Sequence, residues 1–429
     1  MTLTDGVRFG SSVARTLGNA VVANAAGARR RVRIDAEFTT FDPMDAATAA
    51  QPYEAYRRLH AGGRVQYSAK RKVWILSRLD DVRAAARDDV NLSSADGPTL
   101  TRIPAPILVS LDGEEHARQR RQVMPAFTKA ALDSWRPIID RLAAETVQDV
   151  LANPGCDMVQ RLAIPMPVRL IAQLLGVPDT DVADFRRWSE ASVQITNLDL
   201  SARGARRLAG ALHGSWAMHR YFTRQFSSGG LKGSNTILGR LLAENAAGSL
   251  PDRELFYFAM LLLLAGNETT TNLLGGMFDT LAAHPEQYDL LRANPDLVPM
   301  AVEELLRYLS PAQNVHRTAV NDYRVGPDGQ VTIPAGARIM LAIGAANRDP
   351  RAFDEPDAFR VDRNPTQHMT FGFGAHLCIG AQLTRMEAQA VLRELVTHVS
   401  RISVVGATQW STNSLLRGPK RLAARLTPA

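Results

Sequence analysis

The sequence predicts a mainly α-helical protein with a small β portion. From Glu114 to about Gln225, apolar residues recur at spacings of three and four, which is the helical period. A later helix, opening at Ser249, is apolar on nearly all sides and therefore belongs inside a core. The stretch from Tyr323 to Leu341 alternates apolar and polar residues, as strands do. The 429 residues give a prior of roughly three domains, but one large core also accommodates this length.

The N-terminal part is expected to contain an extension, a helix and a hairpin. We expect residues 1–40 to form an exposed, flexible extension and residues 41–429 to form one domain. A helix is predicted from Pro52 to Leu59. Strand-like runs at Arg64–Tyr67 and Val73–Ser77 flank a basic tip, which indicates a hairpin.

The central part is predicted to be helical with defined interruptions. Breaks fall at 153–155, Asn-Pro-Gly, and at 176–178, Gly-Val-Pro. The run from Ser227 to Ser234 is a flexible link, because the helical pattern resumes directly after it. At Ser249 the sequence Ser-Leu-Pro-Asp matches a helix cap with Pro251 in the first turn.

The C-terminal part combines two helices with short strands. One helix is predicted around Val302 to Leu309 and a final one from Ile379 to about Val399. Between them, the turn sequences 327–329, Pro-Asp-Gly, and 334–336, Pro-Ala-Gly, separate strand-like runs.

Charge and cysteine content exclude several classes of function. The chain has 50 basic and 43 acidic residues, and the resulting net charge of +7 is too small to indicate a nucleic-acid-binding surface. Two cysteines cannot build a disulfide framework, so we expect a reducing, cytoplasmic location. The longest apolar run, Leu255–Gly266, is shorter than the ~20 residues that a membrane helix needs. We therefore expect no membrane span.

A glycine-rich loop delivers one cysteine to the start of the final helix. Its sequence from Phe371 to Gly380 is Phe-Gly-Phe-Gly-Ala-His-Leu-Cys-Ile-Gly. A helix N-terminus lowers the pKa of a thiol, so Cys378 is a candidate thiolate. Gly372 and Gly374 let the loop bend close to a flat ligand. A redox thiol or a buried structural cysteine fits the same residues.

The pattern Phe-Gly-x-Gly-x-His-x-Cys-x-Gly resembles the signature of the cytochrome P450 family. Three further family motifs occur in the expected order, at 112–120 (Asp-Gly-Glu-Glu-His-Ala-Arg-Gln-Arg), 265–270 (Ala-Gly-Asn-Glu-Thr-Thr) and 304–307 (Glu-Leu-Leu-Arg). The resemblance covers roughly Gln51 to Leu426. It implies a single-domain, triangular helical prism with haem b between the core helix and the cysteine-loop helix.

The resemblance also assigns residues to the cofactor. It implies Cys378 as the axial iron ligand, with Phe371, Gly372, Ala265 and Gly380 beside the haem. The implied partners of the propionates are His116, Arg120, Arg317 and His368, because buried carboxylates need hydrogen-bonded cations. Glu304 and Arg307 are implied to form a buried structural ion pair that locks the loop before the cysteine.

Glu268 and Thr269 are the residues that the resemblance implies for catalysis. A carboxylate in an apolar helix is costly unless it has a partner or a task, and the implied task is proton delivery during O2 activation. The hydroxyl of Thr269 could instead bond back to the carbonyl of Ala265.

The substrate is expected to be a hydrophobic small molecule. Helical spacing places Phe258, Leu262 and Ala265 on the face of Thr269, although core packing alone would give the same stripe. By resemblance, Gln313, Asn314 and Val315 also line the pocket, and the two amides could orient a polar group. The segments Leu92–Val109 and about Val182–Phe226 match the variable lid of the family.

The implied reaction is a monooxygenation that uses O2 and electrons from a ferredoxin or flavodoxin with its NAD(P)H reductase. Arg118, Arg121 and Arg385 could form a basic face for that acidic partner, or a solvated surface. Alternatives are peroxide-driven or oxidative-coupling and rearrangement chemistry on the same haem, and a haem-based ligand sensor without turnover. A zinc site built from His368, His376 and Cys378 is the non-haem alternative.

Overall fold

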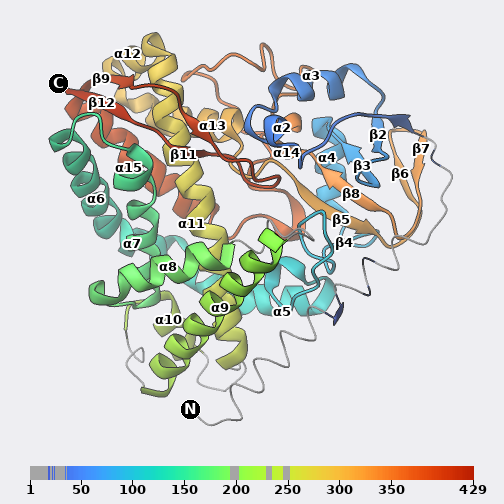
Figure 1. Ribbon diagram of the computed structural model, residues 1–429, viewed down its shortest axis with the longest axis horizontal. Coiled ribbons are helices and arrows are strands. Elements are labelled where there is room, and N and C mark those ends of the chain that lie inside the picture. Colours follow the sequence, from blue (N-terminus) through green and yellow to red (C-terminus); the bar gives the residue numbers. More distant parts are fainter. Residues whose placement is uncertain are drawn as a thin grey trace.

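A computed structural model describes residues 18, 19, 22, 24, 34, 36–193, 202–228, 234–244 and 252–429. Helices dominate these residues, so the predicted class, mainly α with a small β portion, is confirmed (Figure 1). The helices are α2 (Ala46–Ala50), α3 (Tyr53–Ala61), α4 (Leu79–Arg87), α5 (Gly113–Val123), α6 (Lys129–Ala152), α7 (Pro165–Leu175), α8 (Val182–Val193), α9 (Ala202–Ser228), α10 (Ile237–Glu244), α11 (Asp252–Ala283), α12 (Pro285–Ala293), α13 (Val298–Leu309), α14 (Ile343–Ala346) and α15 (Ala381–His398).

Two predicted breaks end helices where expected. Helix α6 ends at Ala152, and Gly155 follows with a φ of 80°. Helix α7 is capped by Gly176 in the left-handed conformation, which glycine adopts without steric cost. The predicted flexible link lies largely outside the described residues, since α9 continues to Ser228 and the chain is described again from Ser234. The predicted cap at 249–251 also lies outside them.

The strands form one larger sheet and three small ones. They are β1 (Glu37–Phe38), β2 (Val65–Ser68), β3 (Val73–Leu76), β4 (Leu92–Ser93), β5 (Val315–Ala319), β6 (Tyr323–Val325), β7 (Val331–Ile333), β8 (Arg338–Leu341), β9 (Val399–Val404), β10 (Gln409–Trp410), β11 (Pro419–Arg421) and β12 (Ala424–Pro428). The larger sheet has the order β1-β2-β3-β8-β5-β4 and lies on the side of the molecule away from α6 and α12 (Figure 1). The predicted hairpin is its antiparallel pair β2 and β3.

The N-terminal extension ends earlier than the sequence predicted. Strand β1 lies at Glu37–Phe38, inside the segment 1–40, and pairs in parallel with β2. A backbone hydrogen bond from Thr39 to the carbonyl of Tyr67 continues this pairing. Residues 37–39 therefore belong to the sheet.

Helix α11 crosses the middle of the molecule and carries the largest core (Figure 1). It packs against α7, α9, α15 and the π-helical turn η3 (Val159–Ala163). Leu263, Leu273 and Met277 are fully buried on it, and each such side chain contributes about 1.5–3 kcal/mol by leaving water. Ala265, near the middle of this buried helix, is exposed.

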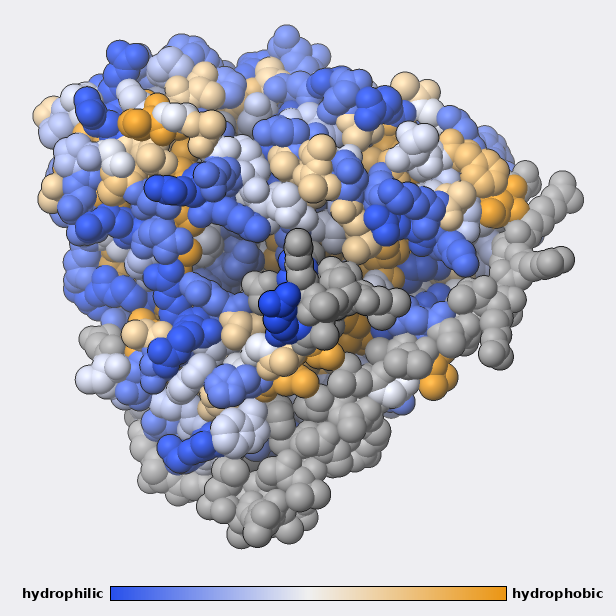
Figure 2. All heavy atoms as spheres, in the orientation of Figure 1, coloured by the Kyte–Doolittle hydropathy of each residue, from blue (hydrophilic) through white to orange (hydrophobic). Residues whose placement is uncertain are grey.

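The outer surface is mostly hydrophilic on the face shown in Figure 2, where hydrophobic residues form small, separate patches. Among the described residues, no helix is both long and apolar enough to cross a bilayer.

Candidate active site

The cysteine loop is held in a tight conformation by its glycines. Gly372 and Gly374 have φ values of 72° and 73°, in the left-handed region. A Cβ atom on Gly374 would lie 3.0 Å from the backbone of α4, so this approach also requires glycine. The N–H of Cys378 donates to the carbonyl of Phe371 at 2.9 Å and closes the loop. The loop thereby places Cys378 three residues before α15 begins.

Cys378 is classed as exposed, although the protein atoms around its thiol desolvate it. Cys378 and the neighbouring Leu377 are exposed to solvent. Burial nevertheless raises the pKa of this thiol, and the N–H groups of Gly380 and Ala381 and the charge of Arg120 oppose that effect only in part. The predicted lowering of the pKa is therefore wrong for the protein alone, because desolvation outweighs the helix N-terminus. A bound metal ion would hold the group as thiolate.

Helix α11 presents accessible polar and small residues at its centre. Ala265 is exposed, and Gly266, Glu268 and Thr269 are half-buried. The hydroxyl of Thr269 donates to the carbonyl of Ala265 at 2.7 Å, as expected for a threonine within a helix. Burial and the nearby Glu190 raise the pKa of Glu268 above its usual range.

A group of basic side chains, of which His116 is buried and Arg120 and His376 are half-buried, lies next to the cysteine loop. The rings of His116 and His376 are 4.2 Å apart, and Nε2 of His116 has no hydrogen-bond partner in the part of the chain that the structure describes. Arg120 donates to the carbonyl of Leu377 at 2.7 Å. Burial, His376 and Arg120 lower the pKa of His116 to about 4. Such a group would be stabilised by an anion.

Arg317 on β5 is a further basic residue of this site and is more deeply buried than Arg120. It is 7% exposed, and burial lowers its pKa to about 10 despite the charge of Asp112. Among the described residues, its guanidinium donates to one acceptor, the carbonyl of His316 at 3.0 Å, and forms no ion pair. The four residues His116, Arg120, Arg317 and His376 therefore have the chemistry that two buried carboxylates require, as in haem propionates.

The structure does not bring His368 to this group. Its Nε2 lies 3.1 Å from a carboxylate oxygen of Glu303 on α13, so a hydrogen bond to Glu303 takes the place of the expected propionate contact. His376 takes the place beside His116 instead. Sequence reasoning assigned it only to a zinc site, although it lies two residues before Cys378 within the motif. Among the described residues, no cluster of three or more metal-ligating side chains occurs, which contradicts the zinc alternative.

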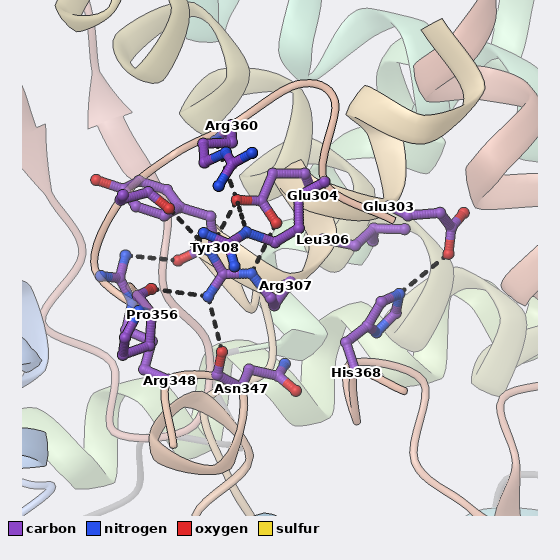
Figure 3. A network of polar contacts seen from close by, with 12 residues as sticks. Glu303, Glu304, Leu306, Arg307, Tyr308, Asn347, Arg348, Pro356, Arg360 and His368 are labelled. Atoms are coloured by element: carbon purple, nitrogen blue, oxygen red, sulfur yellow. Dashed lines mark hydrogen bonds and ion pairs between the residues drawn. The ribbon is translucent and has the colours of Figure 1, made fainter. Parts of the chain in front are cut away.

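Glu304 and Arg307 form a fully buried ion pair on α13 (Figure 3). The two side chains are joined by bonds of 2.7 and 2.8 Å and are completely excluded from solvent. Arg307 also donates to the carbonyls of Asn347, Pro356 and Ala358. The pair thus ties α13 to the chain that precedes the cysteine loop.

The candidate pocket residues are of two kinds, buried apolar side chains and amides that already have hydrogen-bond partners. Phe258 and Leu262 are buried at 5% and 7% exposure, and Phe258 lines a small cavity next to α5. Gln313 donates to the carbonyls of Leu309 and Ser310 and accepts from Tyr56, so its amide is already engaged.

Asn314 is engaged in the same way, because its amide donates to the carbonyl of Ser414 at 2.7 Å. The expectation that these two amides orient a substrate is therefore not supported, since both satisfy backbone groups where α13 turns into β5. Val315 starts β5 and is half-buried. Of the lid, α8 and α9 pack together, and residues 194–201 between them lie outside the described residues.

The three arginines expected on a basic face differ in their partners. Arg118 pairs with Glu115 and Glu254, and Arg385 pairs with Glu303. Arg121 is exposed, and no ion pair is found for it among the described residues. Intramolecular carboxylates thus neutralise most of this face.

Comparisons with known proteins agree with this arrangement. The family described as Cytochrome P450 matches residues 224–402. The chain is 47% identical over 422 residues to beta-dihydromenaquinone-9 omega-hydroxylase of Mycobacterium tuberculosis, covering 98% of this chain and 86% of that protein. It is 31% identical to cytochrome P450 107B1 of Saccharopolyspora erythraea, covering 82% and 89% of the two chains.

Solved structures share the fold. Cytochrome P450 CYP109Q5 from Chondromyces apiculatus superposes with a TM-score of 0.82 at 30% identity, covering 91% of this chain and 98% of that one. CYP109E1 from Bacillus megaterium in complex with testosterone gives a TM-score of 0.78 at 30% identity, covering 87% and 99%. With a cysteine loop, a cation group and a core helix arranged as described, the chain belongs to the cytochrome P450 family of haem-thiolate monooxygenases.

Proposed function

We propose that Cys378 binds the iron of haem b and that His116, Arg120, Arg317 and His376 bind its propionates. The observation that carries this assignment is the group of basic side chains at the loop of an exposed cysteine, with Arg317 buried and lacking an ion-pair partner among the described residues. Haem with an axial thiolate supplies O2 activation. Phe371, Gly372, Ala265 and Gly380 would border the ring, and the haem-binding domain would span residues 41–429 together with β1.

Glu268 and Thr269 are proposed to deliver protons. Thr269 keeps its hydroxyl oriented through the bond to Ala265, and its oxygen can still accept a second hydrogen bond. Glu268 is a half-buried carboxyl group whose pKa burial raises, and carboxyl groups serve as general acids and bases.

The proposed substrate is a long, apolar isoprenoid lipid, such as the side chain of a reduced menaquinone. The support is the 47% identity to an enzyme named for omega-hydroxylation of beta-dihydromenaquinone-9, together with the apolar side chains of Phe258 and Leu262. Titrating the ferric enzyme with menaquinone and, separately, with testosterone should give a low-spin to high-spin shift with the quinone at lower concentration. Tighter binding of the steroid would contradict this substrate class.

The electron donor is proposed to be a ferredoxin or flavodoxin with its NAD(P)H reductase, in the cytoplasm. Arg121 remains available to an acidic partner. Both cysteines are free thiols, which suits a reducing compartment.

The assignment of the ligand is tested by replacing each cysteine. The reduced, carbon-monoxide-bound enzyme should show the thiolate band, Cys378→Ala should lose it, and Cys156→Ala, the matched control, should keep it. Loss of the band in Cys156→Ala with retention in Cys378→Ala would overturn the assignment.

The proton-delivery role is tested with Thr269→Ala. This variant should keep the thiolate band but divert electrons, so that the hydrogen peroxide formed per NAD(P)H rises severalfold. Thr280→Val removes a hydroxyl further along α11 and should leave this ratio unchanged. Full coupling in Thr269→Ala would contradict the role.

A further inference from the structure

Glu303 joins two residues that lie on either side of the cysteine loop. Its carboxylate accepts two hydrogen bonds from Arg385 on α15, at 2.6 and 2.8 Å, and lies 3.1 Å from Nε2 of His368. Figure 3 shows Glu303 and His368 facing each other, away from the neighbouring Glu304 and its network. One side chain of α13 therefore holds the chain both before and after Cys378.

The hydrogen bonds define the protonation of His368. Its Nδ1 accepts the N–H of Thr370 at 3.2 Å, so the proton of the neutral ring resides on Nε2 and is donated to Glu303. The closer contact of Glu303 is with Arg385, whose guanidinium forms the ion pair with this carboxylate.

The charge of Arg385 lies close to the cysteine loop. Its guanidinium stacks over the ring of Phe371, with 4.6 Å between the guanidinium carbon and the ring centre. The carbonyl of Phe371 accepts the N–H of Cys378. Whatever neutralises Arg385 therefore changes the potential felt at the axial ligand.

We propose that Glu303 is a positioning residue that neutralises Arg385 and thereby sets the reduction potential of the iron bound to Cys378. The inference rests on the proposed haem ligation. Glu303 is well suited to this task because it stays ionised: burial would raise its pKa, but the bonds from Arg385 and His368 lower that pKa to about 2. Its side chain is 17% exposed, so solvent screens the pair only in part.

The test is Glu303→Gln in the haem-loaded enzyme, measured by spectroelectrochemical titration without a redox partner. Glutamine keeps an acceptor for His368 but removes the charge, so Arg385 is left uncompensated beside the loop. The reduced form should be favoured about tenfold, which corresponds to about 59 mV more positive for one electron. The matched control is Glu394→Gln, which removes one carboxylate, paired with His398 on the same helix, and should leave the potential unchanged.

Two further variants separate charge from structure. Arg385→Gln leaves Glu303 uncompensated and should shift the potential in the opposite direction, even if Glu303→Gln does not retain haem. The double variant should return towards the parent potential.

The proposal is overturned if either single variant keeps the thiolate band and its equilibrium constant for reduction stays within twofold of the parent value. It is also overturned if the double variant keeps the full shift of Glu303→Gln. Failure of the parent enzyme to show a thiolate band at all would instead refute the proposed ligation by Cys378.

Discussion

Arg307 and Arg317 are both buried arginines, yet their surroundings differ. Arg307 is 0% exposed, and its guanidinium donates to Glu304 and to three backbone carbonyls. Arg317 is 7% exposed and donates to one carbonyl among the described residues. The first arginine is fully satisfied by the protein, whereas the second has no ion-pair partner among the described residues. The number of partners, more than the depth of burial, thus distinguishes the structural Arg307 from Arg317, which we propose binds a haem propionate.

The largest effect is expected for Arg307→Ala. It leaves Glu304 buried without its main cation, which should destabilise the apoprotein by about 3–5 kcal/mol. Thermal and denaturant unfolding of the haem-free protein measure this loss. An apoprotein of unchanged stability would show that the pair is dispensable.

Arg317→Leu should weaken haem binding without destabilising the apoprotein. Removing an unpaired buried cation should leave the apoprotein at least as stable, while haem affinity falls about 100-fold, or about 2.7 kcal/mol. Haem transfer to an apoglobin measures the affinity, and denaturant unfolding measures the stability. If Arg317→Leu destabilised the apoprotein as much as Arg307→Ala, the distinction between the two arginines would fail.

Glu387 extends the comparison to an unpaired acid. It is 3% exposed on α15, its Oε2 has no hydrogen-bond partner within the described ranges, and burial raises its pKa to about 8. Between the unfolded pKa near 4.5 and about 8, the folded state keeps a proton that the unfolded state has lost. Stability from this group therefore falls as the pH rises, by about 1.4 kcal/mol between pH 6 and 7.

Glu387→Gln cannot ionise and should remove that slope. The measurement is the difference in unfolding free energy between the parent and the variant at several pH values from 5 to about 8. A constant difference across this range would show that Glu387 is paired or hydrated in solution.

The smallest effect is expected at an exposed pair. Lys129 and Asp133 are 2.5 Å apart, but their side chains are 91% and 44% exposed. Lys129→Ala should change the unfolding free energy by less than about 0.5 kcal/mol. A larger loss of unfolding free energy, measured by the same denaturant method, would mean that the number of partners and their burial do not determine how much an ion pair stabilises this protein.

The sequence was sufficient for the elements but not for every contact. Periodicity located α3, α13 and α15, and the motif identified the loop that carries Cys378. The resemblance placed His368, and not His376, at the propionates, because side-chain directions after the left-handed residues Gly372 and Gly374 do not follow from spacing. The sign of the thiol pKa was also missed, since it depends on how many atoms surround the sulfur.

The amide groups of Gln313 and Asn314 illustrate a second limit. Polar residues after a helix can face a ligand or satisfy the backbone, and only the folded turn shows that both bond to carbonyls here. The roles of Glu268 and Thr269 remain predictions that the proposed experiments test.

The adjacent glutamates of α13 restrict the length of that helix. Successive helical residues are about 100° apart, and Glu303 and Glu304 use this angle to reach two different loops. A single residue inserted within α13 before this pair would turn both carboxylates away from their partners together. Engineered insertions should therefore be accepted in the connections between helices and rejected inside α13.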